Sequence, residues 1–379
     1  MRRYKTYING EWFEGTSGIV LRSVDPSNNQ ELGEIVQNSK EDVEYAIESA
    51  SRSFYKTREW RDLDVQQRSD KLLKIADMIE SEIDEIAKTE SMDNGKPLRE
   101  AQADVDDAVH CFRYYAGLIR TPSGQTYNVN SNFGNMHSYT LKEPVGVCAL
   151  ITPWNFPFLM SVWKIAPALA AGNSIIFKPS SETVLSALKL FEILDKCDLP
   201  KGTANLVIGS GSTVGNLLAE SKKVDMITFT GSTSVGQGIM RAAVGNVKKI
   251  GLELGGKSPN IVFADTDIDK TVEWVMMGIF LNQGEVCCAG SRLIIEKSIK
   301  DKFLKKLVER TDKLTLGAPL DNPDMGPLIS KKHMQDVLGY IEKGKAEGAK
   351  LLCGGYKCTD DDLVNGNFIK PAIFDDCTP

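Results

Sequence analysis

The feature that most constrains the fold is a strict alternation of short apolar runs and helical patterns between Val145 and Leu252. Helices that alternate with short strands predict a parallel sheet covered by helices on both faces. The predicted strands cover 145–151, 174–177, 205–208, 226–229 and 249–252, and the helices between them cover 161–171, 183–195, 213–221 and 234–243.

A second alternation begins after Gly255 and Gly256, so we expect two α/β domains that meet near 253–257. Upstream of the sheet, apolar residues recur at helical spacing, and the segment 121–140 is polar and loosely alternating, which predicts an exposed hairpin. The second alternation predicts strands at 260–263, 293–296 and 368–374 and helices at 268–280, 300–314 and 331–347, and the upstream helices are predicted at 42–56, 65–87 and 104–119, with a breaker at 94–97.

Charge and composition exclude several classes of function. Lys and Arg total 45 of the 379 residues against 51 Asp and Glu, and this balance argues against a nucleic-acid or anionic-membrane partner. The most apolar stretch is interrupted by proline, asparagine and lysine, so no membrane span is expected. Eight cysteines without a C-x-x-C pair, three histidines and no signal peptide predict a protein without a metal site in the reducing cytoplasm.

A glycine- and serine-rich turn at 229–236 follows a predicted strand and opens a predicted helix. The helix N-terminus offers unpaired N–H groups that suit a phosphate, Gly231 allows close backbone approach, and Ser232 can donate a hydroxyl. The same pattern also fits a simple helix cap. Its place in a doubly wound sheet favours a nucleotide.

Two thiols and one carboxylate are candidates for chemistry. Cys287 and Cys288 lie among small and polar residues between a helix and a strand, although cysteine is more often a small buried hydrophobe. Glu253 alternates with apolar neighbours at the end of a strand, just before two glycines. It is either a surface residue or a base pointed into the interdomain cleft.

The segment 152–157 predicts a rigid loop at the carboxyl end of a strand, where ligands of α/β proteins bind. Asn155 has the only neutral side-chain amide in this loop, and its N–H could stabilise an oxyanion. Lys178 ends another strand and could reach ribose hydroxyls or a phosphate.

These motifs, in this order, resemble the aldehyde dehydrogenase superfamily from residue 8 to the last residue. The segments 145–148, 246–249 and 259–263 are most similar to the betaine-aldehyde branch. The resemblance implies that Cys287 is the nucleophile, that Glu253 is the general base and that Asn155 forms the oxyanion hole with the Cys287 backbone N–H. Cys288 is then a neighbour without a chemical role.

The resemblance also implies a Rossmann-like NAD(P)-binding domain at 1–120 and 142–252, an oligomerisation hairpin at 121–141 and a catalytic domain at 253–379, incomplete at its C-terminus. NAD is the expected cofactor, and Ser181, in place of a glutamate common among NAD-preferring members, leaves NADP open. Lys178 is expected to bind the ribose and Ser232 the phosphate. The remaining implied residues are Trp154, Thr152, Gly231 and Gly236 for the cofactor and Phe156, Met160 and Trp163 for the aldehyde tunnel.

The implied reaction is oxidation of an aldehyde to its carboxylic acid through a thiohemiacetal and a thioester on Cys287. Glu253 activates the water that hydrolyses the thioester. Besides Ser181, two features depart from the family pattern. Glu285 replaces a common glutamine, and a second ribose-binding glutamate should come just after Pro379.

Several alternatives follow from an incomplete catalytic domain. The chain is an active dehydrogenase, a truncated and inactive remnant, or a thiol esterase that needs no cofactor. The family implies a homodimer or homotetramer, which the loss of one side of the contact would disturb. The substrate is expected to be a small aldehyde, with betaine aldehyde as the choice that the resemblance suggests.

Overall fold

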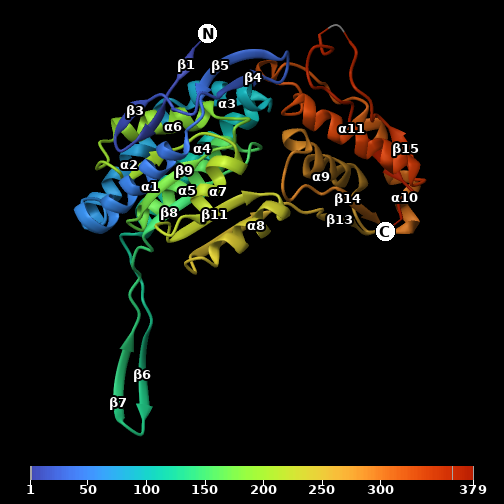
Figure 1. The fold of residues 1–379 in the computed structure, drawn as a ribbon. Coiled ribbons are helices and arrows are strands. Elements are labelled where there is room, and N and C mark those ends of the chain that lie inside the picture. Colours follow the sequence, from blue (N-terminus) through green and yellow to red (C-terminus); the bar gives the residue numbers. More distant parts are fainter. Residues whose placement is uncertain (1, 361, 379) are drawn as a thin grey trace.

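The protein is described by a computed structural model that covers residues 2–360 and 362–378. The predicted domain limits at Met1 and Pro379 lie outside the described residues. A seven-stranded sheet forms the larger part, a second, smaller part follows it in the chain, and a hairpin projects away from both (Figure 1).

The large sheet has the strand order β12-β11-β8-β9-β10-β2-β3, in which the first five strands are parallel. The parallel strands are β8 (Val147–Ile151), β9 (Ser174–Lys178), β10 (Ala204–Leu206), β11 (Met226–Gly231) and β12 (Lys249–Leu254). All five residues of β8 and of β9 are buried, as expected for strands covered on both faces. The predicted parallel sheet is therefore confirmed.

Alternating side chains of β8 enter two different cores, which shows that helices cover both faces. Cys148 and Leu150 belong to one core, and Val147 and Ala149 belong to the other. The first core is built with α2 (Val65–Ser81), α4 (Leu98–Leu118), α5 (Pro157–Ala170) and α6 (Leu185–Lys196), and the second with α1 (Lys40–Arg52), α7 (Asn216–Glu220) and α8 (Thr233–Ala243).

Local signals explain where several helices begin. The Ser39 side chain accepts from the Asp42 N–H at the start of α1, and Ser232 accepts from the Val235 N–H at the start of α8. The five residues Gly211–Gly215 precede α7 as a π-helical turn, η2, and Ser53–Thr57 extend α1 as η1.

The predicted single helix over 65–87 is wrong, because the chain forms two helices there. Glu82 leaves helical geometry, with φ −111° and ψ 15°, and α3 (Ile83–Asn94) starts in a new direction. Gly95, at φ 99°, then ends α3 at the predicted breaker. This change of direction lets α3 pack on both α4 and α6.

Short strands at the N-terminus extend and cover the sheet, and the sequence analysis did not predict them. Two of them join the large sheet in antiparallel orientation, and three form a separate sheet. Their bounds are β2 (Thr6–Ile8) and β3 (Glu11–Phe13) for the pair, and β1 (Arg3–Tyr4), β4 (Val20–Asp25) and β5 (Gln30–Val36) for the separate sheet.

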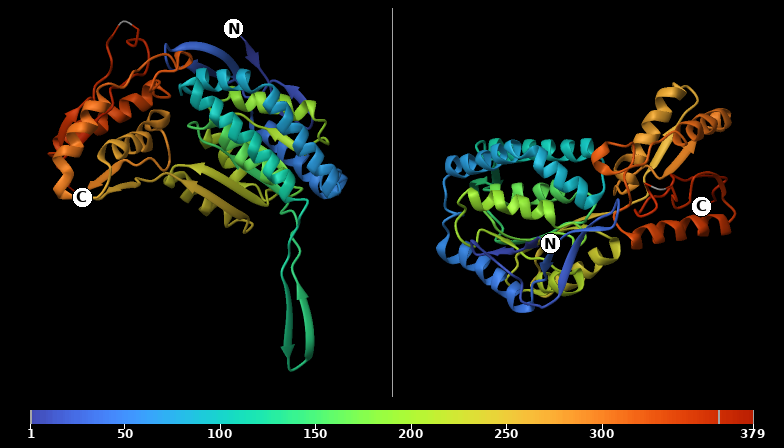
Figure 2. Two further views of the ribbon diagram at one scale, coloured as in Figure 1. Left: turned by 180° about the vertical axis from the view of Figure 1, so that it is seen from behind. Right: turned by 90° about the horizontal axis from the view of Figure 1, so that it is seen from above.

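The predicted hairpin is present as β6 (Thr126–Ser131) and β7 (Gly134–Tyr139), and the described side chains of β7 are all exposed. It extends well beyond the rest of the molecule in Figure 1 and in the left view of Figure 2.

The residues after Leu254, here called the C-terminal region, contain two small sheets and three α-helices among the residues described. The parallel pair β13 (Pro259–Val262) and β14 (Arg292–Ile295) lies with α9 (Ile268–Phe280) and α10 (Lys300–Thr311) around a small core. The antiparallel pair β15 (Lys350–Cys353) and β16 (Ile373–Asp375) follows α11 (Lys331–Ala346). The residues up to Leu254 are called the sheet region.

The predicted strand over 368–374 is wrong for its first five residues. β16 starts at Ile373, two residues after Pro371, which has no N–H to donate to a ladder. Earlier in this segment Ile369 makes only an isolated bridge with Lys357.

Candidate active site

The carboxyl ends of β8, β9, β11 and β12 bring four predicted site residues to one edge of the sheet. Lys178 is the last residue of β9 and pairs in register with Ile151, directly before Thr152. Glu253 on β12 lies opposite Thr230, and Ser232 follows the end of β11. Because the order reverses between β8 and β11, this edge is the crevice where doubly wound sheets bind ligands.

The groups at this edge fit a dinucleotide. The Lys178 ammonium is almost fully buried and donates to the Pro179 carbonyl at 2.9 Å, and burial lowers its pKa to about 8. The hydroxyl groups of Thr152 and Thr230 are buried with no hydrogen-bond partner in the described part of the chain. A cation and unpartnered hydroxyls are the groups that ribose and phosphate oxygens require.

The turn after β11 places an exposed serine at the start of an eleven-residue helix. The Ser232 hydroxyl is 3.3 Å from that of Ser234, and the helix N-terminus adds N–H groups that favour an anion. Gly236 allows this helix to pack on β12, because a Cβ there would lie 3.0 Å from Leu254 Cδ2. Gly231 also needs to lack a side chain, because a Cβ there would lie 2.4 Å from the Phe229 ring and would clash with it.

The loop before Cys287 turns through three consecutive left-handed residues. Asn282, Gln283 and Gly284 have φ values of 47°, 56° and 80°, and the first two are buried. This turn leaves Cys287 and Cys288 exposed at the end of the loop. The Cys287 carbonyl accepts from the Gly256 N–H at 3.0 Å, which ties the thiol loop to the segment that follows Glu253.

The thiol of Cys287 is not activated by a neighbouring cation in this structure. Partial burial raises its pKa, and contact with the Cys288 thiol adds to the effect. A base or a bound ligand must therefore assist the formation of a thiolate.

Asn155 joins the loop after β8 to the thiol loop. Its side-chain amide donates to the Glu285 carbonyl at 2.8 Å, and its own carbonyl accepts from the Asn282 amide at 2.8 Å. Asn94 supports the same loop by donating to the carbonyl of Trp154 at 2.9 Å. Two further asparagines, Asn94 and Asn282, thus hold the loop of the predicted oxyanion donor, and Asn155 itself is bonded to the loop of the predicted nucleophile.

Glu253 is exposed and lies on the outermost strand of the sheet. Below it, the Lys164 ammonium is buried and donates to the Thr228 hydroxyl at 2.9 Å. Burial lowers the pKa of Lys164 to about 8, and the Glu253 charge opposes this shift. The sequence analysis gave Lys164 no role, although a lysine inside an apolar helix was a visible signal.

The three predicted tunnel residues lie on the loop and first turns of α5. The Phe156 ring is half-buried beneath the Lys96 ammonium, which lies 4.2 Å from its centroid. Met160 is half-buried one turn later, and Trp163 is 51% exposed on the next turn. Trp154, the predicted wall of the cofactor pocket, is half-buried with its ring 5.1 Å from that of His333.

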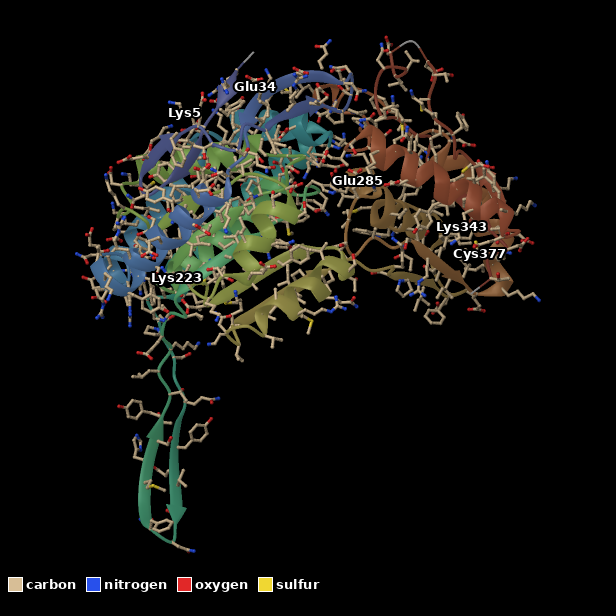
Figure 3. The ribbon with its side chains drawn as sticks, viewed as in Figure 1. Lys5, Glu34, Lys223, Glu285, Lys343 and Cys377 are labelled. Carbon is tan, nitrogen blue, oxygen red and sulfur yellow. The ribbon has the colours of Figure 1, made fainter. Side chains whose placement is uncertain are left out.

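Glu285 and His333 lie close to the predicted site residues, although the sequence analysis gave them no role in the site. Figure 3 places Glu285 where the C-terminal region meets the sheet region. Its carboxyl accepts from the Ile329 N–H at 3.0 Å and lies 3.5 Å from His333 Nε2. The sequence showed Glu285 as a departure from a pattern, but it gave no signal for His333, which is 48 positions further along.

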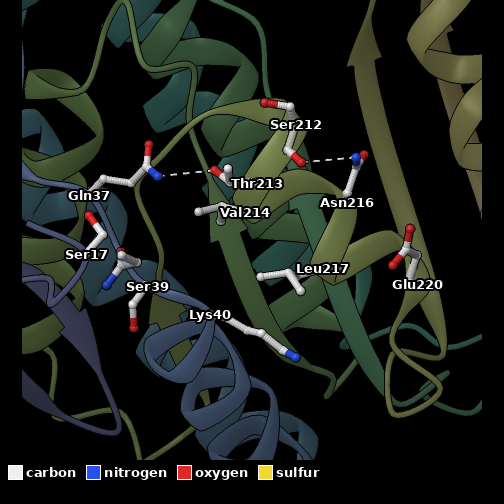
Figure 4. Close-up of a pocket in the computed structure, with 11 residues that line it drawn as sticks. Ser17, Gln37, Ser39, Lys40, Ser212, Thr213, Val214, Asn216, Leu217 and Glu220 are labelled. Atoms are coloured by element: carbon white, nitrogen blue, oxygen red, sulfur yellow. Dashed lines mark hydrogen bonds between the residues drawn. The ribbon is translucent and has the colours of Figure 1, made fainter. Parts of the chain in front are cut away.

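A pocket of about 510 Å³ lies apart from the predicted site residues, between the start of α1 and the η2–α7 segment (Figure 4). Gln37 donates to Thr213 across it at 3.2 Å. None of its lining residues is a predicted site residue. In the described part of the chain, no cluster of three metal-ligating side chains occurs and no helix is long and apolar enough to cross a membrane.

The fold is that of a doubly wound α/β protein, and an exposed thiol lies in a loop that is bonded to the segment after β12. The sequence profile of the aldehyde dehydrogenase family matches residues 12–379. A betaine aldehyde dehydrogenase of Bacillus subtilis is 45% identical over 372 residues, which are 98% of this chain and 75% of the relative. The human mitochondrial aldehyde dehydrogenase is 40% identical over 373 residues, 98% of this chain and 71% of its own. The chain belongs to the aldehyde dehydrogenase family.

Solved structures support the same family assignment. A betaine aldehyde dehydrogenase of Staphylococcus aureus in complex with NAD+ superimposes with a TM-score of 0.95 at 40% identity. The match covers 99% of this chain and 74% of the other. The expected family and fold class are therefore confirmed, and the chain spans about three quarters of the length of these relatives.

Proposed function

We propose that this protein oxidises an aldehyde to its carboxylic acid with NAD+. The observation that supports this most directly is the joining of the Cys287 loop to Asn155, through Glu285, and to the segment after Glu253, through Gly256. In this proposal the nucleophile, the oxyanion donor and the base come from three separate segments, which these two hydrogen bonds tie together.

In this proposal Lys178, Ser232, Thr152 and Trp154 hold the cofactor at the carboxyl edge of the sheet. NAD+, when bound, accepts a hydride from the substrate carbon. The relatives with NAD+ in their solved structures support this choice, and Ser181 keeps NADP as a cofactor to be tested.

The protein residues carry out the covalent steps. The Cys287 thiolate attacks the aldehyde carbonyl, and the Asn155 amide with the Cys287 N–H stabilises the oxyanion that forms. After oxidation of the carbon to the thioester, Glu253 takes a proton from water, which attacks the thioester carbonyl and releases the acid and the thiol. Both glycines after Glu253 lack a side chain that would hinder its approach.

For the substrate we propose betaine aldehyde, because two of the similar proteins described above carry that name. The exposed ring of Trp163 suits a quaternary ammonium group, which binds to aromatic rings, whereas the Lys96 ammonium already covers one face of Phe156. A plain apolar aldehyde would also meet these surfaces, so a panel of aldehydes decides between them.

We also infer that the hairpin β6–β7 contacts a second copy of the chain. Its exposed side chains include Tyr127, Val129, Met136 and Tyr139, which are unusually apolar for a solvated ribbon. We further infer a cytoplasmic setting, which the eight free cysteines favour.

The test is the formation of reduced nicotinamide by the purified protein, with NAD+ or NADP+ and a panel of aldehydes that includes betaine aldehyde. Cys287→Ser should abolish the signal, whereas the matched Cys288→Ser should retain it. Asn155→Ala should reduce kcat by about 10²-fold or more. No reduced cofactor from folded protein would contradict the proposal and support the inactive alternative.

A further inference from the structure

The Glu285 side chain is 1% exposed and lies two residues before Cys287. One carboxyl oxygen accepts from the Ile329 N–H at 3.0 Å and lies 3.5 Å from His333 Nε2. The other oxygen is buried with no hydrogen-bond partner among the residues that the structure describes. The side chain is therefore anchored in the C-terminal region.

The backbone carbonyl of the same residue is bonded to Asn155 of the sheet region and to Asn282 of its own loop. The Glu285 carbonyl accepts from the Asn155 amide at 2.8 Å and from the Asn282 amide at 3.4 Å. A side-chain amide has two N–H groups. With one of them directed at Glu285, the plane of the amide is fixed and the second can point to a reacting oxygen.

The contact between Glu285 and His333 is one between neutral groups at neutral pH. Burial raises the pKa of Glu285 to about 8, although the Ile329 N–H and the Lys96 charge oppose the shift. Burial lowers the pKa of His333, with Asp336 opposing and Lys332 reinforcing the shift. A glutamine, with the same shape and the same acceptor oxygen, can therefore replace the protonated carboxyl.

We propose that Glu285 is a positioning residue for the oxyanion hole: its side chain, held by Ile329 and His333, fixes the carbonyl that orients the Asn155 amide. The proposal rests on the proposed function only in taking Cys287 as the nucleophile and Asn155 as the oxyanion donor. The catalytic groups remain Cys287 and Asn155, and Glu285 acts through the second of them.

Two reactions of one thiol separate this role from a general support of the loop. With p-nitrophenyl acetate, the Cys287 thiolate attacks the ester carbonyl, an oxyanion forms, and nitrophenolate leaves to give an acetyl thioester. With iodoacetamide, the thiolate displaces iodide from a saturated carbon and no oxyanion forms. Both are measured in a Cys288→Ser background, so that the neighbouring thiol does not contribute.

We expect Glu285→Ala to slow the nitrophenolate burst about tenfold or more, because a misdirected oxyanion donor loses most of its effect. Alkylation by iodoacetamide should change by less than about twofold, since the thiol itself is unaltered. Glu285→Gln should restore the burst at neutral pH, and Asn155→Ala should show the same split between the two reactions. Because loss of a buried side chain can disturb folding, His333→Ala provides a second variant, with a smaller split.

The proposal is overturned if neither Glu285→Ala nor His333→Ala slows the burst, or if both reactions slow by the same factor. It is also overturned if the unaltered chain is alkylated at Cys287 but gives no burst, because no oxyanion donor would then be in position. A normal burst with the expected split, but without reduced cofactor from aldehydes, would uphold the role of Glu285 and refute the dehydrogenase.

Discussion

The sheet region and the C-terminal region bury their strands to very different degrees. Ile176 in the middle of β9 is fully buried, whereas Ile261 on β13 and Ile294 on β14 are 59% and 53% exposed. The edge that is predicted to bind the cofactor thus includes the fully buried strand β9, whereas the predicted nucleophile, Cys287, lies in the loop before the more exposed strand β14.

Hydrogen bonds across the boundary compensate for this difference. Asn155 donates to the Glu285 carbonyl, and the Glu100 carboxylate accepts from the Asn282 N–H at 2.9 Å. The thiol loop is thus bonded to the sheet region at two points, in addition to the burial of Asn282, Gln283 and Glu285.

The largest difference between the two regions in the free energy of unfolding is expected when a buried ion pair and an exposed ion pair are broken. Lys96 is fully buried, 2.5 Å from Asp104 and 3.5 Å from Glu90, whereas Lys306 pairs with Asp269 on the surface of the C-terminal region. Lys96→Met should lower the free energy of unfolding by about 3–5 kcal/mol, because two buried carboxylates lose their cation. Lys306→Met should lower it by about 1 kcal/mol or less. Urea denaturation measures both, and equal losses would refute the contrast.

Matched isoleucines test the apolar contrast directly. Ile176→Ala should cost about 2–5 kcal/mol, because it leaves a cavity between two layers of helices. Ile294→Ala should cost less than about 1 kcal/mol, since half of the side chain is already in water. A cost at Ile294 as large as that at Ile176 would show that the outer face of β14 is covered in solution.

Two lysines should respond to pH in opposite directions. Lys178 has a folded-state pKa of about 8, below its ordinary value of 10.5, so the unfolded chain binds more protons between these values. The cost in folding free energy of burying the charged Lys178 ammonium is complete below about pH 8 and falls to zero above about pH 10.5. Lys178→Met should therefore stabilise the protein at neutral pH by up to about 3 kcal/mol.

Lys300 of the C-terminal region has the opposite sign. Its ammonium lies 2.8 Å from Asp375 and 3.1 Å from Asp376, and these hydrogen bonds raise its pKa, although slight desolvation opposes them. The stabilisation that Lys300 gains from these two ion pairs is complete below the ordinary pKa of lysine and is lost as the pH rises through the raised value.

Thermal unfolding from pH 7 to 10 tests the prediction for Lys178. The difference in stability between Lys178→Met and the wild type should become smaller as the pH rises. A gap that widens with pH would contradict the burial of Lys178.

Removal of a helix cap should cause the smallest loss of stability, and the loss should be the same in both regions. Ser39 caps α1 and Ser330 caps α11, each by accepting an N–H three residues later at 3.2 Å. Either change to alanine should cost about 1 kcal/mol, because capping is local. Amide hydrogen exchange in each helix measures the loss. A much larger loss in one helix would mean that the contrast between the regions is more than one of burial.

Much of the sheet region could be predicted from the sequence, because its strands are continuous apolar runs separated by helical spacing. Val147–Ile151 and Ser174–Lys178 were found almost to the residue. The short strands β1 to β5 were not found, since the two of them that join the large sheet depend on an edge that only the folded chain presents. Likewise, nothing in residues 65–87 shows that the chain turns at Glu82.

For the candidate site, motifs predicted which residues are candidates but not how they are held. The residue patterns made Cys287, Glu253 and Asn155 candidates, the resemblance assigned their roles, and these roles stay predictions. The interaction of Glu285 with His333 and Ile329 depends on residues more than forty positions apart, so no local pattern could reveal it.

The central claim is that Cys287 carries the substrate through oxidation and that Glu253 completes the reaction. Mass spectrometry of a Glu253→Gln variant, incubated with aldehyde in the presence or absence of NAD+, tests both parts. The account predicts an acyl adduct on Cys287 that accumulates only when NAD+ is present, because the thioester forms but is hydrolysed slowly. An adduct on Cys288, or no adduct in folded protein that binds NAD+, would contradict it.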